Sequence, residues 1–137
     1  MTYEEKIEQA LQDSKVLIFK ENLSNIDAIT IKAAGVTGVF LKDKEYEPLE
    51  RGYLLGHEKA HIDTNSFYTF SSSSKHRQNC EFKSMKHQVL DAGLAPNEIK
   101  KDLEQGLQAW EIADKYNVYE QLILDAIEVF KVKYWNK

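Results

Sequence analysis

Residues 57–61 read His-Glu-Lys-Ala-His, and this short segment constrains the fold more than any other part of the chain. Two histidines four residues apart lie on one face of an α-helix, so both rings can bind one metal ion only if the segment is helical. The spacing matches the HExxH pattern, in which two imidazoles bind Zn²⁺ and the intervening glutamate acts as the general base. The alternative is an exposed helix face that carries these residues by chance. We therefore expect a helix on which His57 and His61 bind zinc and Glu58 is catalytic.

A catalytic zinc site usually has three protein ligands and one position open to water. The extended pattern HExxHxxGxxH would require a glycine where the chain has Thr64 and a histidine where it has Phe67, so that class is excluded. Glu81 follows a loop and lies on the next expected helix, and two helices joined by a loop can bring such residues to one metal. We expect Glu81 to be the third ligand.

Other side chains near the motif leave alternatives for the third ligand. These are His76 and His87, which flank Glu81 on the same expected helix, and Asp63, which follows the motif closely. At 100° per residue, both histidines lie well away from Glu81 around the helix axis. Cys80 lies four residues after His76, so a Cys-His pair is possible, although a single cysteine in a helix is usually a buried small apolar group.

The composition limits the function classes. The chain has 137 residues, enough for one domain with a proper core, and its net charge is −4. This charge argues against general nucleic-acid binding, which requires a basic surface. The single cysteine excludes an intrachain disulfide and favours a reducing cytoplasm, and we expect neither a signal peptide nor a membrane-spanning segment.

Hydrophobic periodicity predicts an α+β fold, with a small N-terminal sheet followed by a mostly helical body. Residues 3–13 form a helix capped by Thr2 and Glu5, and short strands are expected at 16–19, 28–32 and 39–41. The metal helix covers about 48–62, with Leu49, Tyr53, Leu54 and Ala60 facing the core. A serine-rich loop spans 63–75, and helices follow at 76–92, 96–105, 107–116 and 118–134. We expect one domain, in which 1–93 holds the sheet and metal helices and 94–137 forms a helical tail.

The last expected helix carries an apolar stripe at spacings of three and four. A stripe of this kind is typical of core packing. Its members are Leu122, Ile123, Ala126, Ile127, Phe130 and Tyr134.

With these elements placed, the chain resembles the ImmA/IrrE family of metallopeptidases, in the short form found in phages and mobile elements. The likeness lies in an N-terminal helix followed by VLIFK, in GVFLKD before the metal helix, in YLLGHEKAH, and in Glu81 followed three residues later by the small Ser84. The family usually has a glycine at the position of Ala60 and an aromatic residue and an alanine at those of His87 and Gln88.

The resemblance implies a regulatory protease with Zn²⁺ held by His57, His61 and Glu81, and Glu58 as the base. Its implied partner is a helix-turn-helix repressor of a phage or integrative element, which it cleaves or otherwise inactivates. We expect the segment from Gly38 to Leu41 to pair with an extended substrate. The group that stabilises the oxyanion stays open among Tyr53, Tyr68, His76 and Arg77.

Two alternative functions remain. The protein could bind and inactivate a repressor without cutting it, although a pure binding protein would not need the base Glu58. Residues 110–127 could also be a DNA-reading helix pair. Its candidate recognition stretch, Val118 to Val129, contains three acidic residues (Glu120, Asp125 and Glu128) and no lysine or arginine, and such a surface repels phosphate.

Overall fold

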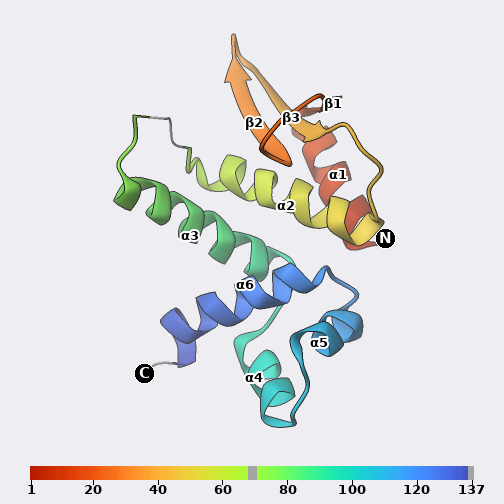
Figure 1. Ribbon diagram of the computed structural model, residues 1–137, viewed down its shortest axis with the longest axis vertical. Helices are drawn as coiled ribbons and strands as arrows, with labels where there is room; N and C mark the ends of the chain where they lie inside the picture. The colour runs from red at the N-terminus through yellow and green to blue at the C-terminus, as the bar shows by residue number, and fades with distance from the viewer. Residues whose placement is uncertain (68–70, 136–137) are drawn as a thin grey trace.

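The computed structural model describes residues 1–67 and 71–135, and Figure 1 shows its α+β architecture. Within these ranges the chain forms a three-stranded sheet and six α-helices. In chain order the elements are α1 (Tyr3–Asp13), β1 (Leu17–Glu21), β2 (Ala28–Ala33), β3 (Val36–Lys42), α2 (Pro48–Thr64), α3 (Ser74–Asp91), α4 (Pro96–Glu104), α5 (Ala109–Tyr116), α6 (Glu120–Phe130) and the π-helix η1 (Lys131–Trp135).

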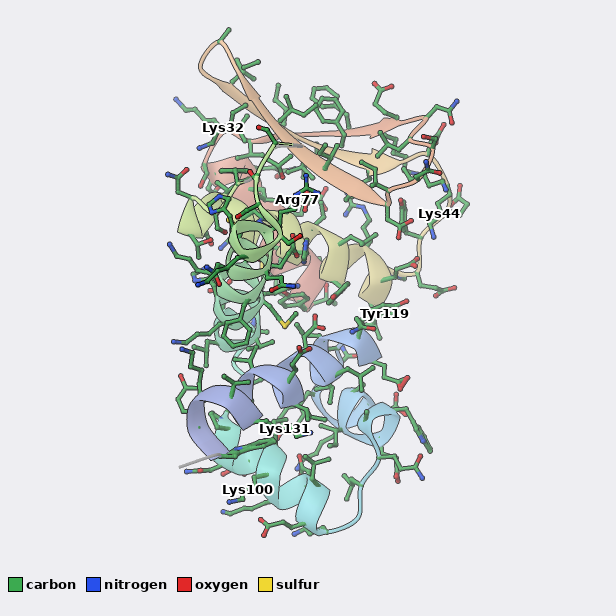
Figure 2. The ribbon with its side chains drawn as sticks, turned by 60° about the vertical axis from the view of Figure 1, so that its left-hand side comes forward. Lys32, Lys44, Arg77, Lys100, Tyr119 and Lys131 are labelled. Carbon is green, nitrogen blue, oxygen red and sulfur yellow. The ribbon has the colours of Figure 1, made fainter. Side chains whose placement is uncertain are left out.

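The sheet has the order β1-β3-β2, so β3 is the central strand and β2 is an edge. β1 runs parallel to β3, and β2 runs antiparallel to it. Strand side chains alternate between faces, which places Val39 and Leu41 on the face toward the helices, where both are buried. All helices lie on this one side of the sheet (Figures 1 and 2).

The opposite face of the sheet is apolar and exposed. The register places Leu17, Phe19, Ile29, Ile31 and Phe40 on this face, and the rings of Phe19 and Phe40 stack with their centroids 5.1 Å apart. Leu17 and Ile31 each keep nearly half of their surface exposed. No other described element covers them.

The capping signal of the first helix is confirmed. The Thr2 hydroxyl accepts from the Glu5 amide, and the Glu5 carboxylate accepts from the Thr2 amide, both at 3.1 Å. α1 then packs closely on α2, because Gly52 and Gly56 present no side chain toward it. A β-carbon at Gly52 would lie 3.1 Å from the Cα of Glu4, and one at Gly56 would collide with the Tyr3 hydroxyl.

Two apolar cores lie on either side of α2. The first is formed by α1, the sheet and Leu55 of α2, and the second by α3 and the helices that follow it. The stripe expected on the last helix is largely confirmed, because Leu122, Ile123, Ala126 and Phe130 are fully buried in the second core. Tyr134 is the exception, since α6 ends at Phe130 and Tyr134 lies on η1 with 42% of its surface exposed.

Other differences from the expected elements are small. β3 is longer than 39–41, and α2 continues to Thr64, where Asn65 ends it in the left-handed conformation. Leu49, expected to face the core, is 36% exposed, while Leu55 is buried instead. Both shifts reflect tertiary packing, which periodicity alone could not place.

Candidate metal centre

The HEKAH segment lies in α2, so the two histidines share one helix face. Pro48 at the first turn and the Asn65 cap bound this helix. The Nε2 atoms of His57 and His61 are 3.2 Å apart, and their rings meet edge to face. Both nitrogens therefore point to one place beside the helix.

Glu81 reaches the same place from α3. One carboxylate oxygen lies 3.5 Å from His57 Nε2, and the other lies 3.4 Å from His61 Nε2. Ser84, one turn further along α3, is fully buried, and its hydroxyl donates to the Glu81 carbonyl at 3.0 Å. The small side chain at this position allows α3 to approach α2 closely.

The three side chains have the donor types of a His₂Glu zinc site and are close enough together to hold one ion. Their ligand atoms all lie within 4.8 Å of one another. Bonds of about 2.0–2.1 Å at tetrahedral angles separate neighbouring ligand atoms by roughly 3.3–3.4 Å. The 3.2 Å between the two histidine nitrogens agrees with this value, and Glu81 faces the pair with one oxygen toward each histidine. The His57 and Glu81 side chains are about one-third exposed, so the centre is open to solvent on one side.

His61 is held by a backbone partner on its other nitrogen. Its Nδ1 lies 2.8 Å from the Ser66 carbonyl oxygen, which can only accept, so Nδ1 carries the proton and Nε2 keeps its lone pair. Burial lowers the pKa of His61, but hydrogen bonds to Glu81 and Ser66 and the charge of Glu58 outweigh it, and the net pKa is raised. The turn after α2 therefore orients the imidazole with its Nε2 toward His57 and Glu81.

The Glu58 side chain extends from α2 toward β2, and Glu58 is only 5% exposed. Its Oε1 accepts from the Thr30 hydroxyl of β2 at 3.3 Å. Burial raises the pKa of Glu58, although the nearby imidazoles of His57 and His61 and the Thr30 hydrogen bond oppose the shift. A carboxylate buried this deeply beside two imidazoles is unusual for a glutamate, and this makes Glu58 a candidate functional residue.

The alternative ligands lie elsewhere. His76 Nε2 is 3.6 Å from the buried Cys80 thiol, and His87 Nε2 is 3.0 Å from Asp63. Neither histidine belongs to the group formed by His57, His61 and Glu81.

A second cluster contains Asp63, His87 and Asp91, whose ligand atoms also lie within 4.8 Å of one another. The Lys59 ammonium lies 2.5 Å from Asp63 and 3.5 Å from Asp91. A lysine thus already supplies the positive charge at this exposed cluster.

Of the four candidates for oxyanion stabilisation, His76 lies beside the Cys80 thiol, as described above. The Tyr53 hydroxyl donates to the buried Asp125 at 2.7 Å, so its proton is engaged away from the centre. Tyr68 lies outside the described residues. Arg77 is in the first turn of α3, one helical turn before Glu81, and is half-buried (Figure 2). Spacing places Arg77 on the same face of α3 as Glu81.

Sequence reasoning missed Thr30 and Ser66, the residues that hold Glu58 and His61. Thr30 had a weak signal, because it stands between Ile29 and Ile31 and so faces the side opposite to them. Ser66 had none, since its backbone carbonyl is the contact and any residue would supply it.

No protein-family model matches this chain, and neither a curated protein nor a solved structure matches it. Among the described residues, no helix combines the length and apolar character needed to cross a bilayer.

Proposed function

We propose that this chain is a zinc-dependent endopeptidase of the regulatory type. The observation that carries the proposal is the convergence of His57, His61 and Glu81, with ligand atoms within 4.8 Å of one another, beside the buried carboxylate of Glu58. Binding alone would account for the three ligands but not for a dry carboxylate next to them. A hydrolase needs both.

The chain's own residues have separate roles in this proposal. His57, His61 and Glu81 would hold Zn²⁺, which supplies a Lewis acid and lowers the pKa of water to near neutrality. Glu58 takes a proton from the attacking water and returns it to the leaving amine. Thr30 and the Ser66 carbonyl orient Glu58 and His61. Arg77 is our candidate to donate to the oxyanion.

An extended substrate has a place beside these residues at the edge of the sheet. β2 is an edge strand, and Thr30 in its middle contacts Glu58. A peptide that adds to this edge would pass the metal centre, with backbone hydrogen bonds holding it. The expectation that Gly38–Leu41 pairs with substrate is wrong, because β3 is the central strand and both of its edges are already paired.

For the substrate we propose a helix-turn-helix repressor of a phage or integrative element, as the ImmA/IrrE resemblance implies. The exposed apolar face formed by Leu17, Phe19, Ile29 and Ile31 supports a protein partner, because patches of this kind commonly mark protein contacts. The helix considered for DNA reading, α6, packs on α3 and α5, and its Asp125 is buried.

The test is cleavage of the helix-turn-helix repressors encoded in the source genome, each incubated with zinc-loaded protein and analysed by mass spectrometry. We expect one repressor to be cut by the wild type and left intact by Glu58→Gln. Repressor binding without cleavage by either protein would instead establish the alternative, a non-catalytic antirepressor with the same fold. Equal cleavage by both proteins would show that Glu58 is not the base.

A further inference from the structure

A pocket of about 410 Å³ lies between the N-terminal half of α2, the start of β2 and the first turns of α6. Tyr53 and Leu54 of α2 form one wall, and Tyr119 and Leu124 form the opposite wall (Tyr119 is labelled in Figure 2). The volume falls in the usual range of roughly 300–1,000 Å³ for ligand pockets, and it is large enough for one long side chain.

The pocket is close to the metal centre along two elements. On α2, Tyr53 lies one turn before His57, and the two ring centroids are 6.4 Å apart. Along the chain, Asp27 directly precedes β2 and is three residues before Thr30. Three residues of extended chain span about 10 Å. A peptide held along β2 over Glu58 would therefore place a side chain within three residues of the scissile bond at this pocket.

The lining of the pocket is acidic. It contains the carboxylates of Asp27, Glu50 and Glu120, and none of its lining residues is a lysine, arginine or histidine. Lys44 lies outside the lining and pairs with Glu50 at 3.5 Å. No described basic side chain forms an ion pair with Asp27 or Glu120, so these two carboxylates give the pocket its charge.

Two aromatic rings complete the pocket. The centroids of Tyr53 and Tyr119 are 5.5 Å apart, and hydrogen bonding to Asp125 fixes the Tyr53 ring. Aromatic faces attract cationic groups and pack against the methylene stem of lysine or arginine. Carboxylates together with aromatic rings are the combination that recognises a long basic side chain.

We propose that this pocket is a substrate subsite that binds a lysine or arginine side chain located within three residues of the bond to be cut. The inference rests on the proposed peptidase function for its role, and on the pocket alone for the binding. It assigns a recognition role to the C-terminal helices, because Tyr119, Glu120 and Leu124 belong to the segment that begins α6. The specificity would then come from the helical tail and the chemistry from α2 and α3.

The first test measures binding without catalysis. The blocked peptide acetyl-Ala-Ala-Arg-Ala-Ala-amide is titrated into ¹⁵N-labelled Glu58→Gln protein, beside the same peptide with neutral citrulline in place of arginine. We expect amide shifts at Tyr119, Glu120 and Leu124 for arginine only, weakening with added salt. The double variant Asp27→Asn, Glu120→Gln should reduce the affinity about tenfold.

A matched control removes the same number of charges elsewhere, in Asp114→Asn with Glu104→Gln, both exposed and outside the pocket. This control should bind the arginine peptide as the parent protein does. Equal binding of arginine and citrulline, or an equal loss in the control variant, would overturn the subsite.

The second test separates failure of the subsite from failure of the proposed function. A proteome-derived peptide library is digested with zinc-loaded wild type and with the Asp27→Asn, Glu120→Gln variant, and the new termini are mapped. We expect lysine and arginine to be enriched at one position near the cut, with the enrichment lost in the variant. Glu58-dependent cleavage without this enrichment overturns the subsite alone. Peptide binding at the pocket in a protein that cuts nothing supports the subsite and overturns the peptidase.

Discussion

Removing the Glu81 carboxylate tests the metal centre most directly. Glu81 is the one candidate ligand that comes from α3, and it contacts both histidines of α2. A zinc ion bound by all three side chains joins two helices and stabilises the folded state, because the unfolded chain does not hold these donors together. Glu81→Gln keeps the side-chain size and removes the charge.

The size of the effect follows from the chain length and the site. With free zinc at one hundred times the dissociation constant, binding adds about 2.7 kcal/mol to the free energy of unfolding. A chain of 137 residues unfolds with an entropy of about 0.29 kcal/mol/K, so the midpoint should rise by about 9 °C. Loss of a residue that only supports a metal ligand weakens zinc affinity by up to about a hundredfold, and we take this value for Glu81→Gln. The free energy of unfolding gained from zinc then falls to about 0.4 kcal/mol, or roughly 1 °C in the midpoint.

The assay is thermal unfolding followed by circular dichroism, with and without zinc at one fixed concentration. Glu98→Gln, an exposed glutamate on α4, serves as the control and should keep the full shift. A Glu81→Gln protein that keeps the wild-type shift would show that Glu81 does not bind the metal, and a wild type that zinc does not stabilise would show that the centre does not bind zinc.

Four further predictions concern residues of α2 at or near the centre. Glu58→Gln should bind zinc as the wild type does but cleave substrate about 10²–10⁴ times more slowly; unchanged turnover would remove Glu58 from the mechanism. In zinc-free protein, burial raises the pKa of Glu58 above its ordinary 4.5, so the stability that this group contributes is present at low pH and lost as pH rises. In urea unfolding, the free energy of unfolding of Glu58→Gln should therefore exceed that of the wild type by an amount that grows from pH 4.5 upward. A difference in free energy of unfolding that does not change with pH would contradict the burial argument. Gly56→Ala should lower the free energy of unfolding by about 1–3 kcal/mol, since the new methyl group meets the Tyr3 hydroxyl and outweighs the helix-propensity gain of up to about 1 kcal/mol; a stabilised variant would mean that α1 can move away without cost. Tyr53→Phe should cost about 1–3 kcal/mol in urea unfolding by removing the donor to buried Asp125; a variant as stable as the wild type would show that this hydrogen bond does not support the fold.

Much of the secondary structure could be predicted because its signals are local. The capping pair of Thr2 and Glu5, the proline before the metal helix and the apolar stripe of residues 122–130 each act within a few residues of chain. Element ends were less predictable, since packing decides whether Leu49 or Leu55 faces the core.

The strand order could not be read from the sequence. The segments of β1, β2 and β3 all look alike as short apolar runs, and only their pairing shows that β3 is central and β2 is the edge. Because of that strand order, we propose that an extended substrate adds to β2 instead of Gly38–Leu41.

The helical period alone fixes His57 and His61 on one face with Glu58 between them, so the metal chemistry to be tested follows from local sequence. The sequence also pointed to Glu81 through the donor type and the following helix. Only the tertiary structure brought Glu81 within 3.5 Å of the histidines, buried Glu58 against Thr30, and set the tail beside α2 to form the acidic pocket. These contacts join residues far apart in the chain, and their distances depend on how the helices and the sheet pack.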